Sequence, residues 1–165
     1  MIIIKIPLIF HIEKTNNKIA PNKFVKINNQ AIYNGSLNRF GRAIVMENLH
    51  NYISVFLPKK LKNLEIKKRI LINYKLRTVI NHGDIRRVKG KTSWKKPNKA
   101  TYQANWDLDN LMFIWIKAFN DALVKNKAVL TDSVGVIVGT NYEFEEVEDL
   151  ESAELEISIQ LKLKT

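Results

Sequence analysis

The chain has 165 residues, of which 45% are hydrophobic, so it can bury the core of one domain and is not compositionally disordered. The absence of cysteine excludes disulfide bonds, thiol catalysis and cysteine-ligated metal centres. No apolar run approaches the roughly 18 residues of a membrane-spanning helix, and we expect residues 1–7 to be a strand rather than a signal peptide. A protein without a membrane partner is therefore expected, and the lack of cysteine fits a reducing compartment.

Charge is distributed unevenly along the sequence. The net charge is +11, but residues 1–106 carry 22 Lys and Arg against 4 Asp and Glu, whereas residues 107–165 carry 5 against 12. An AT-rich genome would enrich lysine without sorting the charges in this way. The first part is therefore predicted to present a basic surface to a polyanion, nucleic acid above all, with a merely solvated basic face as the alternative.

The first half of the sequence predicts two strands around one helix. Residues 2–12 are apolar enough for a strand, and residues 14–35 form a long polar loop. Ser36 can cap a helix that runs to about Leu57. Its buried stripe is predicted from apolar residues near helical spacing: Leu37, Phe40, Ile44, Leu49, Tyr52, Ile53 and Phe56. Residues 69–79 alternate between apolar and polar side chains and predict a second strand.

The second half predicts a long loop, a helix and two strands. Residues 80–106 are too long for a passive connection, which indicates a functional loop. Residues 109–125 form a helix, and residues 134–144 and 153–163 form strands, with a solvated run of acidic residues between them. The buried side of this helix is predicted to be Leu108, Leu111, Met112, Trp115, Phe119, Ala122 and Leu123. The order β-α-β-loop-α-β-β predicts an α+β fold, a small mixed sheet with two main helices packed on one face.

The sequence lacks the common catalytic and ligand-binding motifs that use histidine, serine or a glycine-rich loop. His11, His50 and His82 lie far apart in no ligand spacing, so each is expected to be structural or exposed. The sequence has no glycine-rich phosphate loop and no serine nucleophile elbow. Catalysis in this chain would therefore depend on carboxylates.

The acidic segment that begins at Asp107 is the first candidate site. If Asp107 lies in extended chain and Asp109 or Asn110 opens the helix, the carboxylates converge at a helix N-terminus, where the macrodipole favours anions. Two close carboxylates repel each other, which a hard divalent cation relieves, and Asp132 is the candidate third oxygen donor. All-oxygen ligation suits Mg²⁺ or Mn²⁺. In the alternative, Asp109 is an ordinary N-cap and Asp107 and Asp132 are turn formers.

Four short motifs follow one another in the C-terminal half: Asp107-Leu-Asp-Asn-Leu111, Lys117, Asp121-Ala-Leu123 and Val129-Leu-Thr-Asp132. Over residues 100–163 the chain thereby resembles the RusA-type Holliday junction resolvases, and before that only in general layout. The resemblance implies a single RusA-like endonuclease domain over residues 1–165, acting as a homodimer that nicks four-way DNA junctions with Mg²⁺ or Mn²⁺. It also implies a role in DNA recombination and repair, in the cytoplasm of a bacterial, prophage-carrying or phage-infected cell.

The resemblance also implies which carboxylates bind the metal ion of the catalytic site, namely Asp107, Asp109 and Asp132. The sequence departs from the family pattern at three positions. Phe113 stands where the family usually has lysine, and Lys117, one turn further on, is the nearest replacement as a catalytic cation. Thr131 stands where the family commonly has an aspartate before Asp132, and Trp106 where a basic residue or proline is frequent.

The predicted DNA-binding residues are cations of the long loop and of the polar face of the strand before it. They are Arg86, Arg87, Lys89, Lys91, Lys95, Lys96 and Lys99, with Lys75 and Arg77. Aromatic residues among the loop cations either stack on exposed bases or pin the loop to the core. The sequence thus predicts a metal-dependent endonuclease for branched DNA. A catalytically inactive nucleic-acid-binding protein of the same fold and a nuclease for flaps or RNA ends are the alternatives.

Overall fold

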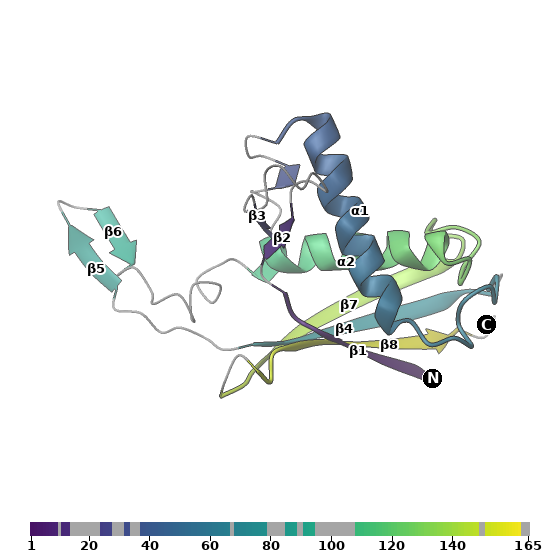
Figure 1. The fold of residues 1–165 in the computed structure, drawn as a ribbon. Coiled ribbons are helices and arrows are strands. Elements are labelled where there is room, and N and C mark those ends of the chain that lie inside the picture. Colours follow the sequence, from purple (N-terminus) through teal and green to yellow (C-terminus); the bar gives the residue numbers. More distant parts are fainter. Residues whose placement is uncertain are drawn as a thin grey trace.

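The computed structural model describes residues 1–9, 11–13, 24–27, 32–33, 37–66, 68–78, 85–88, 91–94, 108–148 and 151–162. These residues form a four-stranded mixed sheet with two long helices on one of its faces (Figure 1). The α+β class with two helices on one face is therefore confirmed. None of the helices in these ranges is long and apolar enough to cross a bilayer.

The central sheet joins the two ends of the described chain. Its strands are β1 (Ile2–Pro7), β8 (Glu154–Leu161), β4 (Ile70–Thr78) and β7 (Ile137–Glu146), in the spatial order β1-β8-β4-β7. β8 is antiparallel to both of its neighbours, whereas β4 and β7 are parallel. A parallel pair needs a crossover connection, and the helix between β4 and β7 in the chain supplies it.

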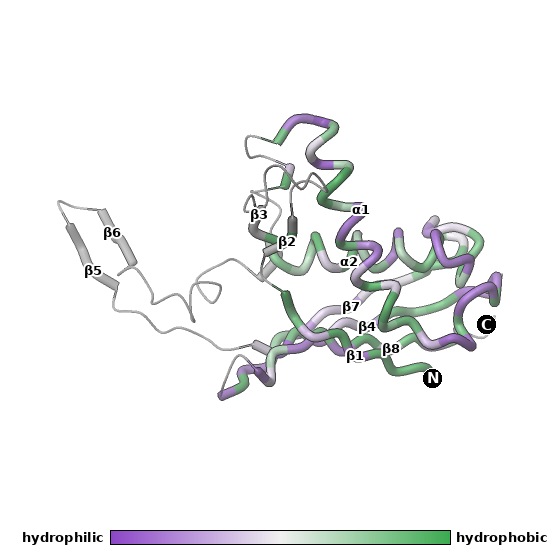
Figure 2. The backbone as a smooth tube through the Cα atoms, in the orientation of Figure 1, coloured by the Kyte–Doolittle hydropathy of each residue, from purple (hydrophilic) through white to green (hydrophobic). Residues whose placement is uncertain are grey.

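Alternation along β4 decides which face of the sheet is buried. Ile70, Ile72, Tyr74 and Leu76 are at most 1% exposed, while the residues between them are partly exposed. Helices α1 (Arg39–Phe56) and α2 (Leu108–Lys125) cover the buried side (Figure 1). Hydrophobic residues follow β1 and much of α2, whereas hydrophilic residues gather at the end of β7, where the connection to β8 begins (Figure 2).

Helix α2 is fixed to the sheet by aromatic side chains. Trp115 and Phe119 are fully buried, and the ring of Phe119 meets that of Tyr74 edge-on with centroids 5.8 Å apart. The Tyr74 hydroxyl donates a hydrogen bond of 2.8 Å to Asn120 Oδ1. The predicted buried side of this helix is confirmed from Leu111 onward, because the side chain of Leu108 lies outside the description.

Several predicted elements differ from the structure. The first strand ends at Pro7, and β2 (His11–Glu13) pairs with β3 (Phe24–Lys26) in a separate ribbon. The predicted loop 80–106 contains β5 (Ile85–Val88) and β6 (Lys91–Trp94), which pair antiparallel. The acidic run was expected between the last two strands. Its first part instead belongs to β7, where it faces cations of β4 across the sheet.

Helix α1 begins later than expected and turns two predicted core residues to solvent. Its N-cap is Asn38, whose Oδ1 accepts a hydrogen bond of 2.8 Å from the backbone N–H of Gly41. This cap satisfies an otherwise unpaired donor of the first turn. Phe40 and Ile44, predicted to be buried, are 78% and 37% exposed because they lie on the side of the helix away from Leu49 and Ile53.

The C-terminal end of α2 has a left-handed cap. The N–H groups of Lys127 and Ala128 donate to the carbonyls of Val124 and Leu123, and Lys127 has a φ of 53°. This is a Schellman motif, in which the left-handed residue is usually glycine.

Replacing Lys127 with Gly is therefore expected to stabilise the fold by about 0.5 kcal/mol. The gain from removing a strained Cβ exceeds the entropy cost of glycine and the lost attraction to the helix dipole. Lys125→Gly, two residues earlier and inside the helix, is expected to cost about 1 kcal/mol. Urea unfolding followed by circular dichroism measures both, and equal signs for the two variants would contradict the assignment of the cap.

Candidate functional site

The unit β4–α2–β7 determines where the Asp107–Asn110 motif lies. Because β4 and β7 are parallel, their carboxyl ends meet at one edge of the sheet, and the helix that connects them begins at that edge. Helix α2 starts at Leu108, so Asp109 is in its first turn and is not the N-cap. Asp107 lies outside the described residues, as does the side chain of Asp109.

A buried hydroxyl at the same edge has no hydrogen-bond partner among the described residues. Thr78 is the last residue of β4 and is only 5% exposed, and its Oγ1 has no hydrogen-bond partner within the described ranges. The indole Nε1 of Trp115, in the N-terminal half of α2, is also buried and unpaired there. Buried polar groups in folded proteins almost always have a partner, so water or another polar group is expected to bind to these two atoms.

Asp132 lies at the other end of α2. The segment that carries it is held by Ala128 on one side and by Val136, whose carbonyl accepts from the N–H of Ile70 at the start of β4. Asp109 and the end of α2 are separated by about 24 Å along the helix axis. The structure therefore does not bring Asp109 and Asp132 together. Among the side chains that it describes, no three acidic or histidine groups could share a metal ion.

Lys117 is the predicted catalytic cation, and the structure places it in an ion pair. Its Nζ lies 3.2 Å from Asp121 Oδ2, one helical turn further on, and its side chain is 41% exposed. Burial acts to lower the pKa of Lys117, but the Asp121 carboxylate outweighs it, with smaller contributions from Tyr33 and Asp132, so the pKa is raised. Lys117 therefore stays protonated at neutral pH and lies within electrostatic reach of Asp132.

Asp121 also contacts helix α1. Its Oδ2 lies 3.4 Å from His50 Nε2, although this contact lacks hydrogen-bond geometry. Burial lowers the pKa of His50 more than the nearby carboxylates raise it, so this histidine is neutral at pH 7. The sequence predicted no partner for His50, and it pointed to Asp121 only as part of the Asp121-Ala-Leu123 motif. The spacing of four between Lys117 and Asp121 on a predicted helix was the available signal.

Phe113, which stands where the resemblance to RusA-type resolvases leads one to expect a lysine, lies on the solvent side of α2. It is 50% exposed, and its ring meets that of Tyr33 edge-on with centroids 6.3 Å apart. The position is therefore accessible, but it has an aromatic neighbour rather than an anionic one. Lys117, one turn further on, has the charge that position 113 lacks.

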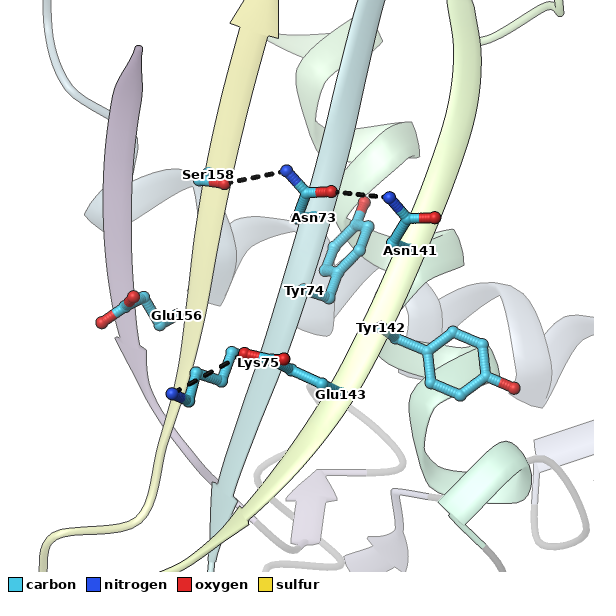
Figure 3. A pocket seen from close by; sticks show the side chains of 8 residues that line it. All are labelled: Asn73, Tyr74, Lys75, Asn141, Tyr142, Glu143, Glu156 and Ser158. Atoms are coloured by element: carbon cyan, nitrogen blue, oxygen red, sulfur yellow. Dashed lines mark hydrogen bonds and ion pairs between the residues drawn. The ribbon is translucent and has the colours of Figure 1, made fainter.

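Lys75 and Arg77, predicted to bind DNA, are already paired with carboxylates. They project from β4 on the face without helices, where Lys75 contacts Glu143 and Glu145, and Arg77 lies 3.0 Å from Glu145 and 2.8 Å from Glu154. A hollow of about 360 Å³ adjoins them. Figure 3 shows the side chains that line it, among which Asn73 links Ser158 to Asn141. DNA phosphates would have to displace these carboxylates to bind there.

The remaining predicted DNA contacts belong to the segment between β4 and α2. Arg86 and Arg87 are in β5, opposite Ser93 and Thr92 of β6, and Lys91 is the first residue of β6. Their side chains lie outside the description, as do Lys89, Lys95, Lys96 and Lys99. Their role in binding DNA stays a prediction.

Comparison with known proteins adds no family assignment. The sequence matches no family model and no curated protein. The resemblance to RusA-type resolvases therefore depends on the residues of the motifs alone.

Proposed function

We propose that the protein is a metal-dependent endonuclease that cuts branched DNA, with four-way junctions as its substrate. One structural observation supports this most directly: α2 begins inside the Asp107–Asn110 motif, at the carboxyl edge of two parallel strands. That edge is where open α/β units usually hold their ligands. The two carboxylates would then be held next to the positive end of an 18-residue helix.

The carboxylate donors fit Mg²⁺ or Mn²⁺ by their chemistry. Bound there, such an ion would lower the pKa of a water molecule and stabilise charge on the phosphoryl oxygens. Asp107 and Asp109 are the residues that would hold it. Asp132 belongs to the same site only if the segment after α2 reaches back toward the start of the helix.

The other groups would bind and orient the DNA. Lys117 is a protonated, partly exposed cation on the same helix and would contact a phosphate near the cut. The basic residues of the segment between β4 and α2 would supply affinity that is independent of sequence. A homodimer would match the two equivalent strands of a junction with one site for each.

A basic DNA-binding protein without catalysis is the second candidate. The net charge of +18 over residues 1–106 favours it, as does the distance between Asp109 and Asp132. The two functions differ in what the protein does to a junction after binding it.

Purified protein should therefore be incubated with labelled four-way junction, duplex or single strand, in Mg²⁺ or in EDTA. The endonuclease is expected to bind the junction in both buffers and to nick it only with Mg²⁺, because EDTA removes the ion from the carboxylates. Binding without nicking at any Mg²⁺ or Mn²⁺ concentration would favour the second candidate. Nicking in EDTA would contradict the metal site.

A further inference from the structure

Asp121 differs from the other acidic residue in the contact between α1 and α2. Glu47 of α1 pairs with Lys125 of α2 and so joins the two helices directly. Asp121 instead uses one oxygen, Oδ2, to contact both Lys117 on its own helix and His50 on the other. The side chains of His50, Asp121 and Lys117 are 14%, 27% and 41% exposed, so this cluster is covered at the histidine and open at the ammonium group.

We propose that Asp121 is a positioning residue, which holds the Lys117 ammonium group at the surface of α2 so that it contacts a phosphate of the bound DNA. This inference rests on the proposed function. A free lysine side chain samples many rotamers, and a carboxylate that is itself packed against α1 restricts them. The ammonium group has three N–H donors, so pairing with Asp121 leaves donors for phosphate oxygens.

A purely structural ion pair is the alternative explanation of the same contact. Ion pairs between residues four apart on a helix stabilise the helix slightly. If the pair does only this, removing Asp121 affects the stability of the helix and not the role of Lys117 in cleavage. The two explanations therefore differ in whether the effects of changing Asp121 and Lys117 on catalysis are independent.

Asp121→Asn, Lys117→Met and the double variant separate these explanations in single-turnover cleavage of a four-way junction with Mg²⁺. We expect Lys117→Met to slow cleavage about 100-fold and Asp121→Asn about tenfold, with little change in the half-saturating junction concentration. The double variant should equal Lys117→Met within about twofold, because Asp121 then has no ammonium group left to hold. Losses that multiply would overturn the inference.

A second measurement does not need cleavage. Acetylation of the full chain by acetic anhydride, followed residue by residue with mass spectrometry, reports how freely each lysine reacts. Asp121→Asn is expected to raise the rate at Lys117 about threefold, since the unpaired amine loses its proton more readily. An unchanged rate would show that Asp121 does not hold Lys117.

Glu47→Gln is the matched control. It breaks the other ion pair of the same helix contact and should free Lys125, without changing acetylation of Lys117 or the cleavage rate. An equal loss of cleavage in this variant would assign the effect of Asp121 to helix packing. Wild-type protein that never cuts overturns the proposed function, while acetylation still decides whether Asp121 holds Lys117.

Discussion

Asp109→Asn is expected to slow Mg²⁺-dependent junction cleavage by roughly 10²–10⁴-fold, since a bound divalent ion contributes several kcal/mol to such reactions. Asparagine keeps the shape of the side chain but lacks the charge that holds the ion. Junction affinity in EDTA should stay equal or become tighter, because one negative charge is removed beside the phosphates. Single-turnover cleavage and equilibrium binding to the same labelled junction measure the two effects.

The control for this prediction is Glu65→Gln, which removes one carboxylate from an exposed position before β4, away from the start of α2. It should leave cleavage unchanged. If Asp109→Asn cuts as fast as the wild type, Asp109 is not a ligand and the basic binding protein becomes the better explanation.

Asp132→Asn decides whether Asp132 belongs to the metal site. A loss as large as that of Asp109→Asn would mean that the segment after α2 reaches the start of the helix when the protein is bound to DNA. A loss of less than about tenfold would leave the metal to the motif at the start of α2 and limit Asp132 to an effect on Lys117.

Trp115→Ala is expected to lower the free energy of unfolding by about 3–5 kcal/mol, which is a large part of the stability of a domain this size. Trp115 is fully buried in the hydrophobic core, so its removal leaves a cavity that the neighbouring side chains fill only in part. Guanidinium unfolding followed by circular dichroism measures the loss without depending on tryptophan fluorescence.

Phe113→Ala is the control for that substitution, since it removes an aromatic side chain from the same helix on the exposed side. The expected cost is about 1 kcal/mol, because half of the ring is already in contact with water. Similar costs for the two variants would contradict the orientation of α2 on the sheet.

The local pattern of the sequence predicted the main helices and strands because burial is periodic. The alternation of β4 and the apolar side of α2 follow directly from which residues face the core. The order of the strands did not follow, because pairing between β1 and β8 joins residues about 150 positions apart. The short strands β3, β5 and β6 were missed because three or four residues are too few to show a period, and β2 was expected as the continuation of the first strand.

The candidate site was predictable only in part, for the same physical reason. A motif at a helix start can be read from adjacent residues, and α2 does begin there. Contacts between different helices and strands cannot be read from adjacent residues. The pairing of Lys75 and Arg77 with glutamates of β7 and β8 is therefore seen only once the strand register is known. The contact between Asp121 and His50 likewise depends on how α1 crosses α2.

The position of β8 between β1 and β4 has a consequence for synthesis in the cell. Strand β1 is made about 150 residues before its hydrogen-bonding neighbour, and this interval takes roughly 8–30 s of translation. During that interval the nascent chain exposes an isoleucine-rich strand and already carries the strongly basic part of the protein, before most of its carboxylates exist. The central sheet can close only when translation has passed Leu161, so the core forms after both helices and the strongly basic part have been made.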